Sequence, residues 1–261
     1  MHHIFVENDY VDLDKKLIII NGDEDFDNYN HLANSLRVRL NESVLCSVMP
    51  FVSAFDYKTR VIEIDNKKIV LQIDEKVECS ELMIKLNLYQ GLAKADKIEY
   101  IIEKAVELGV SSITPLIVTN AIVKIDKEDK KYLNKINRYT KISKSAAEQS
   151  KRHIVPNINM PLTIEEAIQK TKNDYNIVFY ENAEGMEYTK KIIRSIKDEM
   201  QGNSSSKEIN IFIGPEGGYT DEEIQKMRES GFYILTLGKR ILRTETAALV
   251  AITLFMYEFE N

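Results

Sequence analysis

The feature that most constrains the fold is an alternation, from about residue 82 onward, of short apolar runs with longer helical patterns. The runs "LMIKLNLYQ", "ITPLIV", "YNIVFYE", "INIFI" and "YILTLG" have the length of strands. Helical patterns follow as "DKIEYIIEKAVELG", residues 128–150, "YTKKIIRSIKDEM", "DEEIQKMRESG" and "TETAALVAITLFMYEFE". Alternation of this kind favours a parallel sheet covered by helices. We therefore predict an α/β domain over residues 74–261, with Asp96 as the N-cap of its first helix and Gly109 as the stop.

Residues 1–73 show a different sequence pattern, which predicts a small, mostly β domain. The runs "KLIII", "VLCSVM", "RVIEI" and "KKIVLQI" are rich in Val, Ile and Leu and are broken by Asn, Asp and Gly. Asp65 and Asn66 fit a hairpin turn between the last two runs. One helix-like piece, "YNHLANSLR", interrupts the strands, and the charged stretch 74–81 is predicted to be a linker.

Composition narrows the class of protein. The chain has 261 residues, of which 44% are hydrophobic and 29% charged, as in an ordinary core-forming protein. The two cysteines, Cys46 and Cys79, form no C-x-x-C pair, and His2 and His3 have no ligand-spaced partners, so we expect no metal. We expect a cytoplasmic location, because the N-terminus shows no export signal and no apolar stretch approaches the roughly 20 residues that span a bilayer.

The charge is unevenly distributed. The net charge is −6, yet residues 85–155 hold 14 basic and 8 acidic side chains. Residues 130–152 contain eight of these bases and one acid, Glu148, and several of the bases recur at helical spacing. A basic stripe is more often a solvated face, but inside an acidic protein it can also be the footprint of a nucleic acid.

The segment "IFIGPEGGYTDEE", residues 211–223, is a glycine-rich turn between a buried strand and a helix. Thr220 and Glu223 fit a capping box at the start of that helix. The turn thus lies at the carboxyl end of a strand, where open α/β sheets bind ligands. It lacks the phosphate-binding glycine patterns, and the acids that follow would repel a phosphate. From the glycines alone, a ligand turn and a purely structural turn have about equal weight.

A second strand-loop-helix segment, "LTLGKRILRTETAALV", resembles the first. Its loop carries Lys239, Arg240 and Arg243, and Thr244 and Thr246 are predicted helix caps. The helix that follows is apolar on nearly all sides, which is typical of a core or a subunit interface.

Together, "GPEGG", "LGKRILRTETA", "KADKIEYIIEKAVELGV", "AAEQSKR" and "HLANSLRVRLNE" resemble the bacterial 16S ribosomal RNA uracil-N3 methyltransferases of the RsmE type, in the SPOUT superfamily. The resemblance covers nearly the whole chain. It implies a PUA-like β-barrel over residues 1–73 that binds RNA, and a methyltransferase domain with a trefoil knot over 74–261. It also implies S-adenosylmethionine as cofactor, 16S rRNA within the small ribosomal subunit as partner, and a homodimer.

The resemblance assigns residues to three roles. The cofactor-binding positions are Tyr180, Glu181, Gly214, Pro215, Glu216, Gly217, Gly218, Leu237, Gly238, Ile241, Leu242 and Thr244. The catalytic positions are Arg243, Glu245 and Thr246. The basic stripe and the two RNA motifs give an RNA-binding set of Arg37, Lys135, Arg138, Lys144, Gln149 and Arg152.

Two departures from the family pattern affect the expected RNA footprint. This chain has His2 and His3 where the family has an arginine, and Thr119, Asn120 and Ala121 where it has Glu-Arg-Ser. We expect both to lie away from the cofactor loops.

The expected reaction is methylation of N3 of a uridine. Uracil N3 carries a proton and is a poor nucleophile, so the chemistry needs a group that removes the proton and a cation that stabilises charge on O2 and O4. Arg243 suits the second role and Glu245 the first. A different RNA atom as target, and an RNA-binding protein without catalysis, are the alternatives.

Overall fold

The computed structural model describes residues 1–49, 55–78, 81–82, 84–121, 130–202 and 207–260, and the chain divides into two compact units. Unit 1 comprises Met1–Glu81 and Ala147–Ile154, and unit 2 comprises Leu82–Ala146 and Val155–Asn261. The predicted linker at 74–81 is wrong, because strand β6 (Lys68–Glu78) runs through most of it. The boundary between the two units therefore follows Glu81 rather than residue 73. Unit 1 also includes a segment from the middle of the chain, Ala147–Ile154.

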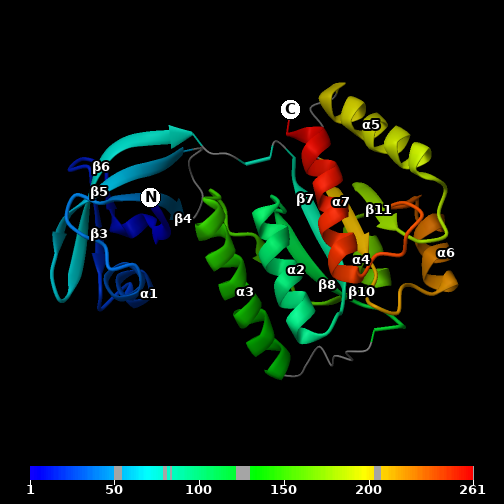
Figure 1. Ribbon diagram of the computed structural model, residues 1–261, viewed down its shortest axis with the longest axis horizontal. Coiled ribbons are helices and arrows are strands. Elements are labelled where there is room, and N and C mark those ends of the chain that lie inside the picture. The colour runs from blue at the N-terminus through cyan, green and yellow to red at the C-terminus, as the bar shows by residue number, and fades with distance from the viewer. Residues whose placement is uncertain (50–54, 79–80, 83, 122–129, 203–206, 261) are drawn as a thin grey trace. The chain divides into compact units, whose positions relative to one another are not determined.

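Unit 1 is built on a six-stranded sheet with the order β1-β4-β5-β6-β3-β2 (Figure 1). Besides β6, its strands are β1 (His2–Glu7), β2 (Val11–Asp12), β3 (Leu17–Asn21), β4 (Ser43–Met49) and β5 (Phe55–Ile64). β1 and β4 run parallel, and the other neighbours are antiparallel. Three short helical pieces, η1 (Asn8–Tyr10), α1 (Phe26–Asn30) and the π-helical turn η2 (His31–Ser35), connect the strands.

The predicted β character of this region is confirmed, as is the hairpin turn between β5 and β6. The Asp65 carboxylate accepts the backbone N–H groups of Lys67 and Lys68, which closes that turn. Alternate residues of the strands, such as Ile18 and Ile20 or Ile69 and Leu71, are fully buried and form the core of the unit.

A buried polar cluster lies inside unit 1. Asp56 accepts hydrogen bonds from the Ser47 hydroxyl at 2.5 Å and from Nδ1 of His153 at 2.7 Å. Nε2 of His3 lies 2.8 Å from the Ser47 hydroxyl oxygen. Because Ser47 gives its one proton to Asp56, Nε2 of His3 must be the donor in that contact. His153 belongs to the segment recruited from the middle of the chain, so the cluster ties this segment to the β-sheet.

Unit 2 contains a parallel sheet with the order β10-β8-β7-β12-β11-β13, with β9 paired to β8. Its strands are β7 (Leu86–Gly91), β8 (Ser112–Ile117), β9 (Asn157–Ile158), β10 (Leu162–Thr163), β11 (Tyr175–Phe179), β12 (Ile209–Ile213) and β13 (Tyr233–Leu235). Every residue of β7, β11 and β12 is buried, as expected for central strands covered on both faces. The predicted alternation of strands and helices is confirmed.

The helices of unit 2 are α2 (Ala95–Glu107), α3 (Lys130–Ser150), α4 (Ile164–Lys170), α5 (Met186–Gly202), α6 (Asp221–Glu229) and α7 (Thr244–Phe259). The last turn of α3, from Ala147 onward, belongs to unit 1. α7 packs against α2 and α5, while α4 packs against α6 (Figure 1). The capping box of Thr220 and Glu223 is present at the start of α6. The prediction for Asp96 is wrong: Lys94 is the N-cap of α2, without a side-chain bond, and Asp96 lies in the first turn.

A row of buried amide side chains crosses the sheet near the amino ends of its strands. Asn87 donates to Asn210 at 3.1 Å, and Asn210 donates to Asn176 at 3.0 Å. At one end of the row the Ser112 hydroxyl donates to Asn87, and at the other Asn176 donates to the Thr171 carbonyl. The four side chains belong to β8, β7, β12 and β11, where they lie directly opposite one another.

Candidate functional site

The carboxyl ends of β11, β12 and β13 meet at one cavity of about 470 Å³ in unit 2. Three segments form most of its wall: residues 179–181, 213–219 and 236–238. The remaining lining residues come from α2, from the loop before α7 and from α7 itself: Lys97, Arg240, Ile241, Leu242, Arg243, Thr244 and Ala247. A cavity of this size falls within the range of small-molecule sites.

The glycine turn after β12 is packed tightly against the end of β7. A Cβ atom at Gly91 would lie 2.5 Å from both the nitrogen and Cδ of Pro215, so only glycine allows this approach. Gly218 has φ +67°, in the left-handed region, and its N–H donates to the Pro215 carbonyl at 3.0 Å. The turn therefore has a defined conformation that presents its backbone to the cavity.

The loop before α7 is joined to this turn through Thr244. The Thr244 hydroxyl donates to the Gly214 carbonyl at 2.6 Å and accepts from Nε2 of the buried Gln90 at 2.9 Å. The prediction that Thr244 and Thr246 cap α7 is wrong, because the N-cap is Arg243, without a side-chain bond. The Thr244 hydroxyl is instead used to hold the two loops together.

Three charged side chains from three segments meet beside the cavity. Nζ of Lys97 lies 3.2 Å from Oε1 of Glu216 and 3.5 Å from Oε2 of Glu245. The hydrogen bond to Glu216 raises the pKa of Lys97, so this side chain stays a cation at neutral pH. Burial favours the neutral form of Glu216, but hydrogen bonds from the backbone and from Lys97 hold its pKa below the usual value.

The structure brings the predicted cofactor residues together. All twelve line the cavity, and so does Arg243. Glu245 is not part of the lining, but its carboxylate pairs with Lys97, which is. Thr246 is exposed on α7 and is not part of the lining either. Sequence reasoning did not assign seven other lining residues to the site: Lys97, Phe179, Ile213, Tyr219, Thr236, Arg240 and Ala247. Lys97 had a signal in the "KADK" motif and Arg240 in the basic loop before α7, whereas no sequence pattern distinguished the other five.

One departure from the family pattern contacts a loop that is predicted to bind the cofactor, contrary to expectation. The Asn120 amide donates to the Gly217 carbonyl at 3.1 Å, and a Cβ atom at Gly217 would lie 2.8 Å from the Asn120 carbonyl oxygen. Thr119 donates both its N–H and its hydroxyl to Glu223 of α6. His3, from the other departure, is buried in the polar cluster of unit 1 and therefore cannot contact RNA.

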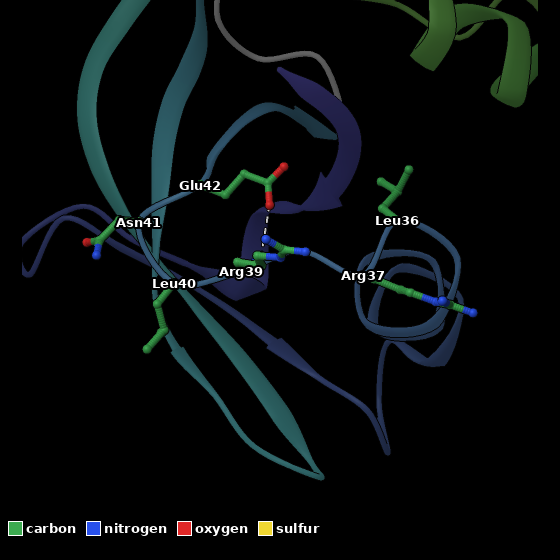
Figure 2. Close-up of a pocket in the computed structure, with 6 residues that line it drawn as sticks. All are labelled: Leu36, Arg37, Arg39, Leu40, Asn41 and Glu42. Atoms are coloured by element: carbon green, nitrogen blue, oxygen red, sulfur yellow. Dashed lines mark hydrogen bonds between the residues drawn. The ribbon is translucent and has the colours of Figure 1, made fainter.

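The predicted RNA-binding residues fall into two places. In unit 1, exposed Arg37 lies at a hollow lined by Leu36, Arg37, Arg39, Leu40, Asn41 and Glu42 (Figure 2). Glu42 shapes this loop by accepting the Arg39 N–H at 2.9 Å (Figure 2). Arg37 and Asn41 both have positive φ, at 53° and 67°, an uncommon conformation that is concentrated at functional loops.

The second place is α3. Lys135, Arg138 and Gln149 are exposed, and Lys144 is half-buried. Arg138 is bonded to Glu99 of α2 at 2.7 Å.

Arg152 does not belong in this RNA-binding set. It is 5% exposed and pairs with Glu81 at 2.5 Å, and Glu81 also accepts the N–H groups of His153 and Ile154. Arg152 thus binds a carboxylate inside unit 1 and is not available to a phosphate.

The sequence predicts neither a membrane-spanning helix nor a metal site, and the structure addresses both only for the residues it describes. None of the described helices is long and apolar enough to cross a membrane. No group of His, Cys, Asp or Glu side chains suited to a metal ion occurs among the described residues, and Cys79 lies outside them.

Comparisons with known proteins agree with this arrangement. Residues 80–256 match the model of a family described as RNA methyltransferase domain. The chain is 33% identical to the ribosomal RNA small subunit methyltransferase E of Bacillus subtilis over 88% of each chain. It is 31% identical to the corresponding protein of Buchnera aphidicola over 90% of each chain. The crystal structure of a ribosomal RNA small subunit methyltransferase E from Neisseria gonorrhoeae, bound to S-adenosyl methionine, is 27% identical with a TM-score of 0.77. That alignment covers 99% of this chain and 98% of the other.

Proposed function

Since this chain belongs to the ribosomal RNA small subunit methyltransferase E family, we propose that it transfers the methyl group of S-adenosylmethionine to N3 of a uridine in 16S ribosomal RNA. One observation carries the proposal. The twelve residues that the family resemblance assigns to the cofactor come from three separate segments, and all of them line a single cavity. This convergence of residues from separate segments on one cavity supports their assignment to a single cofactor site.

The cavity suits an adenosyl ligand. Phe179, Leu237 and Leu242 provide apolar wall, and the Gly214–Gly218 turn provides backbone groups for polar contacts. Glu181 and Glu216 also line it, which fits a ligand that carries positive charge better than a polyphosphate. When bound, S-adenosylmethionine supplies an electrophilic methyl group on a sulfonium.

The residues beside the cavity have the chemistry that uracil N3 needs. The exposed guanidinium of Arg243 is a permanent cation with planar donors, suited to charge that develops on O2 and O4. Glu245 is the carboxylate that would accept the N3 proton, directly or through water. Lys97 is not the base, because its pKa is raised and it remains protonated.

RNA would be held by the exposed side chains of Lys135, Arg138 and Arg37, together with the half-buried Lys144. Each contact with a phosphate releases counterions, so a set of several bases contributes affinity without reading sequence. Gln149, exposed near the end of α3, would add a neutral hydrogen bond. The substrate we propose lies within the small ribosomal subunit, in the cytoplasm.

The proposal extends to three structural features of the family. Unit 1 would be the PUA-like RNA-binding domain, and the loops around the cavity would form the trefoil knot. The protein would be a homodimer through α7, where Leu249, Val250, Leu254 and Met256 are only partly covered and Tyr257 is 73% exposed. Such an apolar surface is typical of a subunit interface.

Mass analysis of nucleosides from the ribosomal RNA of a strain that lacks the gene tests the function. We expect N3-methyluridine to disappear from 16S rRNA and to return when the wild-type gene is restored, but not with an Arg243→Ala gene. Loss of a different methylated nucleoside would reassign the target atom. Unchanged modification would leave an RNA-binding role without catalysis and contradict the proposal.

A further inference from the structure

Lys97 connects the two loops that enclose the cavity. It projects from the first turn of α2, whereas Glu216 belongs to the glycine turn after β12 and Glu245 to the first turn of α7. The ammonium lies 3.2 Å from Glu216 and 3.5 Å from Glu245, and the backbone N–H of Lys94 also points to Glu216 at 3.5 Å. Among the described residues, Lys97 is the only cation that forms an ion pair with either carboxylate.

A second, neutral connection lies next to the ionic one. Thr244, adjacent to Glu245, bonds to Gly214 of the glycine turn and to Gln90 of β7. Gln90 and Thr244 are buried, whereas the Lys97, Glu216 and Glu245 side chains remain 27%, 19% and 18% exposed. The start of α7 is thus held to the glycine turn by a buried hydrogen-bond pair and by a partly exposed ion cluster.

We infer that Lys97 is a positioning residue, which fixes the first turn of α7 against the glycine turn and so sets the geometry of the cofactor cavity. The inference rests on the proposed function for the identity of the ligand. Arg243 immediately precedes that turn as its N-cap, so the same ion cluster also fixes the backbone from which the proposed catalytic guanidinium extends.

The charges of the cluster do not balance. One ammonium faces two carboxylates, and Oε2 of Glu216 is buried without a hydrogen-bond partner among the described residues. Removal of Lys97 would leave two adjacent carboxylates uncompensated, and repulsion would drive the loops apart. The effect is electrostatic, so it depends on a positive charge at this position and not on the shape of a lysine.

Calorimetric titration with S-adenosylmethionine tests the inference. We expect Lys97→Met to weaken binding by roughly tenfold or more, and Lys97→Arg to restore most of the affinity. The matched control is Lys104→Met on the same helix, since the ion pairs of Lys104 with described residues are those with Glu103 and Glu107 of its own helix. In a double-mutant cycle, Glu245→Gln should cost less in the Lys97→Met background than in the wild type, because its partner is already gone.

The controls separate this inference from a failure of the proposed function. If the wild-type protein does not bind S-adenosylmethionine, the proposed function fails. If the wild type binds and Lys97→Met binds equally well, or if Lys104→Met loses as much, the positioning role is wrong. Raising the salt from about 0.05 M to about 0.5 M should narrow the difference between the wild type and Lys97→Met. A Lys97→Arg protein that melts like the wild type yet binds no better than Lys97→Met would also overturn it.

Discussion

Replacement of Gly91 by alanine tests how the glycine turn of the proposed cofactor site is supported. The added Cβ would lie 2.5 Å from the nitrogen and Cδ of Pro215 and 2.9 Å from the carbonyl carbon of Gly214. Carbon atoms normally approach to about 3.5 Å, so the turn must move by roughly 1 Å, and backbone atoms cannot rotate away. Overpacking of this kind costs about 1–3 kcal/mol of unfolding free energy. A displacement of about 1 Å can cost about 10²-fold in activity, since catalysis depends on position.

The assay compares Gly91→Ala with Gly185→Ala, where a Cβ would meet no atom within 4 Å. The control should be as stable as the wild type or slightly more stable, because alanine restricts the unfolded chain. Urea unfolding and calorimetry with S-adenosylmethionine should show a loss of both stability and affinity in Gly91→Ala alone. If Gly91→Ala unfolds and binds like the control, the close packing of β7 against the turn does not shape the site.

Three further predictions follow from side chains described above. Arg243→Ala should keep its melting temperature, because the side chain is exposed, and its cofactor affinity, because we assign the guanidinium to the uracil oxygens. It should lose about 10²–10³-fold in single-turnover methylation. Glu81→Gln should destabilise the protein by about 3 kcal/mol in thermal unfolding, since it leaves Arg152 buried without its carboxylate; Glu75→Gln, from an exposed pair, should cost less than about 1 kcal/mol. Burial lowers the pKa of His3 in the folded state, so the unfolded chain binds more protons and stability should fall as the pH drops below about 6.5. Melting curves at several pH values should show a shallower fall in His3→Gln, and equal falls would contradict this reasoning.

Much of the fold could be predicted because its signals are local. The periodicity of apolar residues predicted the strands and helices of unit 2. The glycine turn and its capping box lie within thirteen consecutive residues, so they could be recognised without knowledge of the fold. The proposed cofactor residues could be named because the family resemblance rests on two such loops and one strand end, which are short continuous segments. Glu216 and Gly218 needed no knowledge of distant segments to be recognised.

What failed depends on contacts between distant parts of the chain. Arg152 stands in a basic, RNA-like context, but its partner Glu81 lies 71 residues away and buries it. Thr244 looks like a helix cap, but a carbonyl 30 residues earlier takes its hydroxyl proton. The attachment of Ala147–Ile154 to unit 1 follows from the buried pairing of His153 with Asp56, 97 residues earlier. No local pattern reports such pairs.

The row of Ser112, Asn87, Asn210 and Asn176 fixes the alignment of the strands that carry the proposed cofactor site at the opposite edge of the sheet. When parallel strands are uniformly apolar, hydrophobic burial does not strongly favour one register over the next. A shift by one residue reverses the face of the sheet that each side chain occupies. In this sheet such a shift would leave buried amide side chains without hydrogen-bond partners. Each unpaired amide would cost about 1–3 kcal/mol of folding free energy. The amide row therefore fixes how far each strand extends. The position at which the glycine turn and the Tyr180 segment would meet the proposed cofactor is thus set at the amino ends of their strands, at the edge of the sheet opposite the cavity.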